Sequence, residues 1–266
     1  MSSELLFLSK VLKSGEFRVI SPGNFKKELG KADSKYVPTI QQDAHDALQT
    51  ILQNMEEELV NDDASKKIIE ETFDGNITRS TTCSKCMNET TITDPMRFMS
   101  LEIPENSNTL EECFKSNMEE EILCDKRCER CCTYEAKTKT LITVTPNVMI
   151  IQLKRFKKEG RLPSKIKKRI SVPPKLDIGE YAIQGENSSY ELASIINHKG
   201  GLAAGHYTAL VRDDQEDSWV LYDDELSERK DVQDVILNKE AYILFYRKMK
   251  KTEREECQNE SQKVRR

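Results

Sequence analysis

One of the chain's three histidines, His206, stands in a sequence that could hold it for acid–base chemistry. Gly205 allows the backbone before it to approach other groups closely, and the strand-like run "HYTALVR" follows. Asp223 and Asp224 end the next strand-like run, "WVLYDD". If the two runs pair as antiparallel strands through the polar turn "DDQED", one of these carboxylates comes to lie beside His206. A carboxylate that orients an imidazole is the base half of a nucleophilic triad.

The other two histidines suit structural roles. His45 falls inside an amphipathic helical pattern, where a histidine next to the buried face is typical of packing. His198 ends a strand-like run just before Gly200 and Gly201, which predicts a loop histidine with no chemical partner. Of the three histidines, His206 is therefore the candidate for catalysis.

The eight cysteines are unevenly distributed along the chain. None precedes Cys83, seven lie between Cys83 and Cys132, and Cys257 lies near the C-terminus. Two Cys-x-x-Cys pairs could each hold one side of a tetrahedral metal ion, and four thiolates suit zinc. The spacing predicts one structural zinc ion on four ligands: Cys83, Cys86, Cys128 and Cys131.

Spacing alone leaves alternatives to this ligand set. Cys124 or Cys132 could replace a neighbouring cysteine as a ligand, or the cysteines could be ordinary reduced thiols. Four protein ligands leave no open coordination position, so the predicted metal would stabilise a small lobe and perform no chemistry itself.

Composition excludes several classes of protein. Hydrophobic residues make up 37% and charged residues 33% of the 266 residues, so a core can form beneath a heavily charged surface. The net charge of −5 gives no global indication of nucleic-acid binding. The early run "LLFL" is too short for a secretory signal, and no apolar run reaches transmembrane length. We therefore expect an intracellular protein of the cytoplasm, the nucleus or both, with reduced cysteines and no membrane contact.

Helical patterns occupy the first part of the chain. Apolar residues recur at helical spacing over residues 35–60, with Thr39 as the expected N-cap and Gln42 as its capping-box partner. Two shorter helices are expected before this one, ending at Gly15 and Gly30.

After Phe73 the pattern changes to short strands, with one short helix over residues 108–118. Helices followed by strands predict an α+β fold. The sequence after Lys248 is charged and lacks apolar periodicity, which predicts a disordered tail. The expected strands include "TLITV", "NVMIIQLKRF", "SYELASIINH", "GHYTALVR", "SWVLYDD" and "AYILFYRK".

A basic run carries nine Lys or Arg residues between Lys154 and Arg169. Such a run could bind nucleic acid or serve as a nuclear address. The favoured interpretation is a solvated hairpin loop after a buried strand, and no nucleic-acid partner is expected.

Seven segments resemble, in order and approximate spacing, the catalytic domain of the ubiquitin-specific proteases: "QQDAHDAL", "TTCSKC", "CERC", "VMIIQLKRF", "GHYTALVR", "WVLYDD" and "AYILFYRK". The match runs from about Leu5 to Lys248. It implies a papain-like fold of thumb, palm and zinc-bearing fingers that grasps ubiquitin and cleaves after its C-terminal glycine. The implied division is a helical thumb over residues 1–72, fingers over 73–145, a palm over 146–248 and a tail over 249–266.

The resemblance also implies roles for individual residues. His206 matches the general base, Asp223 the residue that orients it, and Asp224 a supporting polar position. Asp43 matches an acidic residue that contacts the basic tail of ubiquitin. Gln42 and Asp46 match neighbours in the same box, although the family more often has Glu at the position of Asp46. The zinc-binding fingers of the family favour one ligand set over Cys124 and Cys132: Cys83, Cys86, Cys128 and Cys131.

The sequence departs from the family pattern at the nucleophile. The family's cysteine lies in an N-terminal box resembling Gly-Asn-Thr-Cys-Tyr, at a helix start that lowers its pKa, and an upstream Asn helps form the oxyanion hole. The first 82 residues contain no cysteine, and "LLFLSKVL" looks like the sequence that follows that box. We therefore expect an N-terminally truncated domain that does not hydrolyse ubiquitin conjugates by itself.

Three explanations fit this departure: an incomplete gene model, a transcript with a late start, or a genuine pseudo-enzyme. A missing helix between thumb and palm should leave apolar surface exposed. The alternative function is a catalytically dead module that binds ubiquitin or scaffolds a partner. A further alternative is a zinc-stabilised interaction domain without ubiquitin contact.

Overall fold

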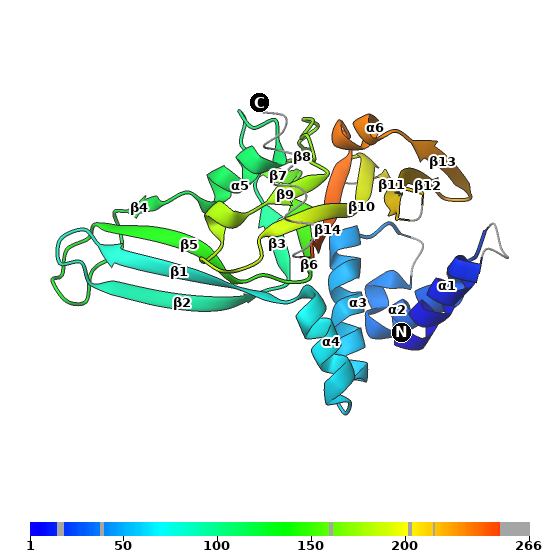
Figure 1. The fold of residues 1–266 in the computed structure, drawn as a ribbon, viewed down its shortest axis with the longest axis horizontal. Helices are drawn as coiled ribbons and strands as arrows, with labels where there is room; N and C mark the ends of the chain where they lie inside the picture. Colours follow the sequence, from blue (N-terminus) through cyan, green and yellow to red (C-terminus); the bar gives the residue numbers. More distant parts are fainter. Residues whose placement is uncertain (15–18, 38–39, 160–161, 202–203, 215, 251–266) are drawn as a thin grey trace.

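In the computed structural model of the chain, α-helices precede the first strand, and most of the later elements are strands. A helical part packs beside a large sheet, and a long narrow sheet extends away from both (Figure 1). Within the described part of the chain, no helix is long and apolar enough to cross a membrane. The structure describes residues 1–14, 19–37, 40–159, 162–201, 204–214 and 216–250, and most of the predicted tail lies outside them.

The helical part is built around a small apolar core. Leu29, Tyr36, Ile51 and Met55 pack together with the buried Met1. The two short helices form where the sequence predicts them, although the second continues past its expected end. The helical elements are α1 (Ser2–Ser14), α2 (Gly23–Ala32), η1 (Ser34–Tyr36), α3 (Ala44–Glu58) and α4 (Asp63–Phe73).

Helix α3 begins later than the sequence analysis predicts. Its N-cap is Asp43, whose Oδ1 accepts a hydrogen bond from the backbone N–H of His45 at 2.7 Å. The other carboxylate oxygen of Asp43 accepts a hydrogen bond from the hydroxyl of Tyr242 at 2.7 Å. The expected cap at Thr39, which lies outside the described residues, is therefore wrong. Asp43 accepts hydrogen bonds from the N-terminus of the helix and from the large sheet at the same time, so the helix starts at Ala44.

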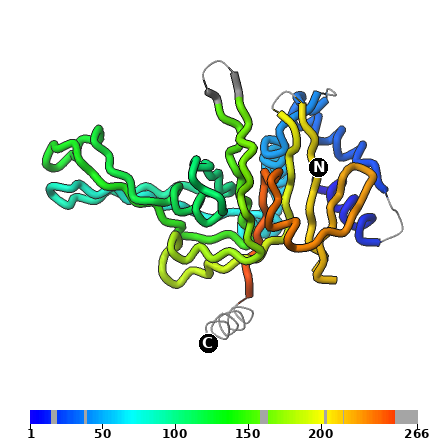
Figure 2. The backbone as a smooth tube through the Cα atoms, turned by 90° about the horizontal axis from the view of Figure 1, so that it is seen from above, coloured from blue at the N-terminus to red at the C-terminus, as the bar shows by residue number. Residues whose placement is uncertain are grey.

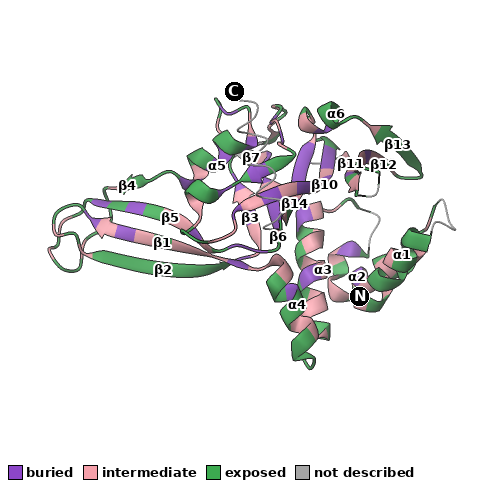
Figure 3. Cartoon of the chain, viewed as in Figure 1, coloured by how far each residue is buried: buried purple, intermediate pink, exposed green. Residues whose placement is uncertain are grey.

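The narrow sheet has the strand order β2-β1-β5-β4. Its strands are β1 (Gly75–Cys83), β2 (Glu89–Met96), β4 (Glu121–Leu123) and β5 (Ala136–Val144). Threonine hydroxyls join the three longer strands: Thr78 bonds Thr93 at 2.9 Å and Thr143 at 3.1 Å. Because much of this sheet is polar or exposed (Figure 3), it buries little apolar surface of its own.

The large sheet has the order β13-β12-β11-β10-β14-β6-β3, with β9 paired to β10. Its central strands β6, β10 and β14 carry much of the buried core (Figure 3). The strands predicted from "GHYTALVR", "SWVLYDD" and "AYILFYRK" are confirmed. The bounds are β3 (Phe98–Leu101), β6 (Val148–Leu153), β9 (Lys175–Asp177), β10 (Ser189–Gly200), β11 (Gly205–Asp213), β12 (Ser218–Asp223), β13 (Leu226–Lys230) and β14 (Ala241–Lys248).

Helix α5 (Leu110–Met118) lies where the sequence predicts a short helix. It begins with a capping box in which Thr109 and Glu112 each satisfy the other's backbone N–H. The fully buried Phe114 packs this helix into the main core. The remaining short elements are η2 (Gly179–Tyr181) and α6 (Val232–Ile236).

The basic run forms a hairpin that projects from the body of the molecule (Figure 2). Its strands are β7 (Phe156–Glu159) and β8 (Leu162–Lys165). Arg155, at its base, is fully buried and donates to the backbone carbonyls of Ala241 and Ile166. The Lys165 side chain is 5% exposed, and its Nζ donates to the carbonyl of His198. These two basic residues anchor the hairpin, because their charged groups donate hydrogen bonds to backbone carbonyls inside the protein.

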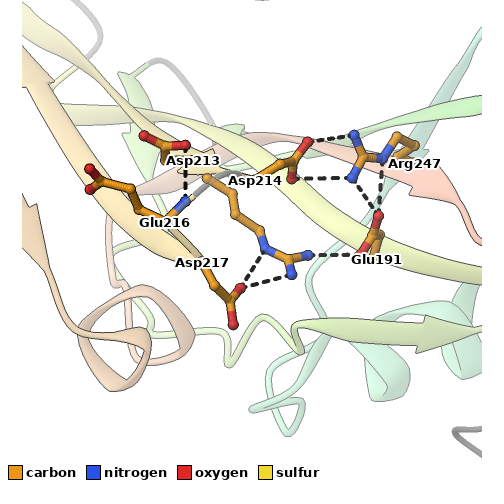
Figure 4. A network of polar contacts seen from close by, with 7 residues as sticks. Glu191, Asp213, Asp214, Glu216, Asp217 and Arg247 are labelled. Atoms are coloured by element: carbon orange, nitrogen blue, oxygen red, sulfur yellow. Dashed lines mark hydrogen bonds and ion pairs between the residues drawn. The ribbon is translucent and has the colours of Figure 1, made fainter.

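The turn between β11 and β12 is fastened to neighbouring strands by charged side chains (Figure 4). Glu191 on β10 accepts hydrogen bonds from Arg247 at 2.6 Å and from Arg212 at 2.7 Å. Arg247 also donates to Asp214 at 2.8 Å, and Arg212 donates to Asp217 at 2.9 Å. Three strands and the turn are therefore joined by one set of ion pairs.

The register of this hairpin decides which carboxylate meets His206. Strands β11 and β12 pair from Ala209↔Tyr222 to Asp213↔Ser218. Side chains alternate between the faces of a strand, so a slip by one residue would move Asp223 to the opposite face.

Arg97, between β2 and β3, joins the helices to both sheets. It donates to Asp74, the C-cap of α4, at 2.5 and 2.6 Å, and to Glu56 of α3 at 2.9 Å. All three side chains are partly buried. The two carboxylates raise the pKa of Arg97 above its ordinary value, which keeps it charged.

We predict that Arg97→Met lowers the free energy of unfolding by about 2 kcal/mol, because two partly buried carboxylates lose their charged donor. Urea denaturation followed by circular dichroism measures this loss. The matched control is Lys67→Met, which removes an exposed pair with Glu71 at 3.5 Å and should cost less than about 0.5 kcal/mol. Equal losses for the two variants would contradict the role given to Arg97.

Candidate active site and thiol cluster

His206 and Asp223 lie side by side at the end of the β11–β12 hairpin. Nε2 of His206 is 2.5 Å from Oδ1 of Asp223, and both side chains are partly exposed, at 42% and 45%. The antiparallel hairpin brings them together as the turn argument predicts. Their assignment as base and orienting residue stays a prediction.

The contact defines which nitrogen of His206 is available for chemistry. Because Asp223 accepts the proton on Nε2, the neutral ring leaves Nδ1 as its acceptor. Within the described part of the chain, Nδ1 has no hydrogen-bond partner. The ring borders a hollow of about 280 Å³ that is also lined by Thr208 and Leu221. The arrangement can therefore accept a proton at Nδ1 from a group placed against the ring.

The electrostatic surroundings favour the protonated form of His206. The hydrogen bond to Asp223 raises the pKa of His206 above 6.5, while partial loss of hydration opposes this change. The nearby charge of Asp224 acts with Asp223, and the charge of Lys199 acts against them.

Asp224 has a structural task next to this pair. Its φ of 51° lies in the left-handed region, which Asp tolerates better than most residues. This conformation ends β12 and turns the chain into β13, where Asp223 pairs with Leu226. The carboxylates of Asp223 and Asp224 and the His206 ring lie within 4.8 Å of one another.

Gln42 and Asp43 lie next to a second hollow. This hollow, of about 490 Å³, separates the start of α3 from strands β10 to β12. Its walls include Ile196 and Tyr207 on the sheet. Thr208 lines both hollows, so the two predicted groups of site residues lie next to the same stretch of β11. Asp46, the third residue of the predicted box, is exposed and 3.8 Å from Lys35.

The three histidines differ in their environments. His45 is buried against Phe98, with ring centroids 4.8 Å apart, so its predicted packing role is confirmed. The prediction of a loop position for His198 is wrong, because β10 continues to Gly200 and His198 is a buried strand residue. Its strand neighbour in β11 is Tyr207. Burial lowers the pKa of His198 below its ordinary value.

Four thiols lie together at the far end of the narrow sheet. Cys83, Cys86, Cys128 and Cys131 place their sulfurs within 4.8 Å of one another. The shortest separations are 3.5 Å for Cys83 to Cys131 and 3.6 Å for Cys86 to Cys128. Four sulfurs bound tetrahedrally to one zinc ion would be about 3.8 Å apart. The cluster could therefore bind a zinc ion.

Polar groups around Cys83 and Cys131 favour their thiolates, whereas loss of hydration and the neighbouring cysteines raise the pKa of Cys86. The hydroxyl of Thr133 lies 3.0 Å from the sulfur of Cys131 and 3.4 Å from that of Cys83. Together with backbone N–H groups, it lowers the pKa of Cys83 to about 6. Cys124 and Cys132 are exposed and do not belong to the cluster.

No described cysteine lines the hollow beside His206. Cys83 belongs to the thiol cluster, and Cys113 is buried in the main core on α5. Cys257 lies outside the described residues. The described chain thus places an imidazole and a carboxylate together without a thiol.

One residue of the site region was not found from the sequence. Gln41 forms two hydrogen bonds with the backbone of Gly205, directly before His206. The two residues are 164 positions apart, and no spacing rule connects a loop glutamine to a distant glycine.

We predict that Asp223→Asn lowers the pKa of His206 toward 6.5, because the carboxylate that stabilises the imidazolium is lost. The raised pKa also means that the charged pair stabilises the fold fully below pH 6.5, and that this contribution disappears as the pH rises through the raised pKa. NMR titration of the three histidines measures the change, with Asp213→Asn at the far end of the hairpin as control. An unchanged His206 titration in Asp223→Asn would contradict the contact.

The chain matches the family model "Ubiquitin carboxyl-terminal hydrolase" over residues 2–246. Ubiquitin carboxyl-terminal hydrolase 22-B of Xenopus laevis is 29% identical over 262 residues, which covers 78% of this chain and 50% of that protein. Human ubiquitin carboxyl-terminal hydrolase 22 is 28% identical with the same coverage. The chain therefore spans about half the length of these relatives.

The solved structures agree with these matches. The SAGA DUB module with Ubp8 bound to monoubiquitin superposes with a TM-score of 0.75 at 28% identity, covering 83% of this chain and 51% of that one. The same module bound to ubiquitin aldehyde gives a TM-score of 0.74. The predicted α+β fold of the ubiquitin-specific protease type is thus confirmed, and the chain belongs to the ubiquitin carboxyl-terminal hydrolase family.

Proposed function

We propose that this chain binds the C-terminal region of ubiquitin and presents the base half of a cysteine-type deubiquitinase site. The observation that carries the proposal is the 2.5 Å contact between His206 and Asp223, which leaves Nδ1 as the proton acceptor of a ring that lines a hollow. Family membership supplies the reaction class, hydrolysis of the peptide or isopeptide bond after the last glycine of ubiquitin.

In that reaction a cysteine sulfur attacks the carbonyl carbon of the last glycine. His206 would take the thiol proton at Nδ1 and return it to the departing amine, while Asp223 holds the ring by Nε2. Water would then hydrolyse the thioester and regenerate the thiol. Asp224 would support the pair through its negative charge, which favours the imidazolium.

We propose that the tail of ubiquitin enters beside Gln42 and Asp43. Both line the 490 Å³ hollow between α3 and the large sheet, and the carboxylate of Asp43 offers negative charge to a basic peptide. Two structural neighbours are complexes of Ubp8 with monoubiquitin and with ubiquitin aldehyde, which supports the same ligand for this chain.

Turnover needs a thiol that the described residues do not place near His206. Losing a member of the nucleophile–base unit lowers turnover by roughly 10⁴–10⁶. We therefore propose that the 266-residue chain binds ubiquitin without hydrolysing it.

We propose a structural zinc ion for the thiol cluster, and we retain the division into thumb, fingers and palm. The narrow sheet has little apolar core, so a metal at its end would hold its loops in place. The seven described cysteines are free, which supports an intracellular location. The buried Arg155 and Lys165 support the interpretation of the basic run as a structural hairpin without nucleic acid.

We predict that the purified chain binds ubiquitin and leaves a fluorogenic ubiquitin C-terminal amide intact. Asp43→Asn should weaken binding about tenfold by removing the negative charge that faces the tail, whereas His206→Ala should leave binding unchanged. Calorimetric titration with ubiquitin measures affinity, with Asp63→Asn on the exposed start of α4 as charge-matched control.

Two results would overturn this function. Absence of binding by a folded, zinc-loaded chain would leave a zinc-stabilised domain that does not contact ubiquitin. Hydrolysis that disappears in His206→Ala would show that one of the chain's own thiols acts as nucleophile. Circular dichroism of Asp43→Asn is required as well, because Asp43 also caps α3.

We further predict one zinc ion per chain by elemental analysis. Cys128→Ser should lose the metal and lower the thermal midpoint, because three thiolates hold zinc less tightly than four. Cys132→Ser changes an exposed neighbour outside the cluster and should retain full occupancy. Loss of zinc from Cys132→Ser with retention in Cys128→Ser would reverse the ligand assignment.

A further inference from the structure

The backbone directly before His206 is hydrogen-bonded to a side chain from the helical part of the molecule. Oε1 of Gln41 accepts a hydrogen bond from the N–H of Gly205 at 2.8 Å. Nε2 of the same side chain donates to the carbonyl oxygen of Gly205. One amide therefore satisfies both polar backbone groups of a single residue, as a paired strand would.

The other side of Gly205 is closed by His198. A Cβ atom at residue 205 would lie 2.0 Å from Nε2 and 2.7 Å from Cε1 of this ring. No real Cβ atom tolerates such a separation. The same Cβ would lie 2.8 Å from the backbone carbonyl oxygen of Lys199, so Gly205 is required here by close approach.

His198 is itself held in place. Its ring packs against Tyr207 at 4.7 Å and Phe156 at 5.3 Å between centroids. Its backbone N–H donates to the carbonyl of Glu240 at 2.9 Å, and its carbonyl accepts from Lys165. The ring of His198 is therefore fixed in place, and the backbone of Gly205 lies between this ring and the side chain of Gln41.

We propose that Gln41 is a positioning residue for the general base: with His198 it clamps Gly205 and so sets the place of the His206 backbone. This inference rests on the proposed function of His206, and it adds a residue that acts through the backbone without touching substrate. Gln41 is exposed, so its two hydrogen bonds to Gly205 are its main contribution to the fold.

The clamp also couples two parts of the site. Gln41 lies two residues before Asp43, which caps α3 and bonds Tyr242 on the large sheet. Residues 41–43 therefore contact the strand of the base at one end and carry the proposed tail-binding carboxylate at the other. A fixed distance between base and bound tail is what a hydrolase of this kind requires.

The test uses the whole chain and needs neither ubiquitin nor turnover. In Gln41→Ala we expect hydrogen exchange at the Gly205 amide to rise about tenfold, because the bond that protects it is lost. The pKa of His206 should fall toward 6.5, since a less fixed backbone spends less time with the ring on Asp223. NMR of the amides and of the three histidines reports both changes.

Two further variants separate positioning from a general loss of stability. Gln41→Glu keeps the acceptor for the Gly205 N–H and should give a smaller rise in exchange than Gln41→Ala. Gln53→Ala removes another exposed glutamine, which donates to Glu57 at 3.0 Å on α3, and should change neither readout.

Unchanged Gly205 exchange and an unchanged His206 titration in Gln41→Ala would overturn the proposal. The proposal would also be overturned if Gln53→Ala changed the Gly205 exchange and the His206 pKa as much as Gln41→Ala does. Failure of ubiquitin binding would refute the proposed function, but Gly205 exchange and the His206 titration could still be measured. The proposed function and the positioning role of Gln41 can therefore be refuted independently.

Discussion

The carboxylate of Asp43 is the point on which the arrangement of helices and sheet depends. One oxygen caps α3, and the other accepts the hydroxyl of Tyr242 from the central strand β14. Tyr242 in turn accepts a hydrogen bond from Gln152 on β6, which is bonded to Ser100 on β3. A polar chain therefore runs from the helix N-terminus across three neighbouring strands. Partly buried hydrogen bonds of this kind are costly to leave unmade, so they favour one docking position.

The same contact explains what the sequence could and could not predict about the helices. Apolar spacing was sufficient to place α3, because the periodicity spans several turns. The cap was misplaced because local rules favour Thr39, whereas the choice of Asp43 depends on Tyr242, 199 residues away. No local pattern contains that information. His198 was misread for a similar reason: the following glycines suggested a loop, but Phe156 and Tyr242 pack against its ring and keep it within the sheet.

The pair of His206 and Asp223 was accessible from the sequence because a single hairpin creates it. A short polar turn between two alternating strands defines both partners, and ion pairs around Glu191 hold the register that the argument assumes. The thiol cluster was accessible as well, because two close pairs of cysteines carry their own geometry. Gln41 was not, since its bonds to Gly205 arise only when the helical part and the large sheet come together.

The close approach of Gly205 and His198 has a consequence for how the chain can change over time. Any side chain at residue 205 would overlap the imidazole at 198, and that ring is enclosed by Tyr207 and Phe156. A smaller residue at 198 would not free position 205, because a Cβ there would still lie 2.8 Å from the backbone carbonyl oxygen of Lys199. A smaller residue at 198 would also leave a void among aromatic rings. Glycine at 205 should therefore persist across descendants of this sequence, even in those where residue 198 has changed.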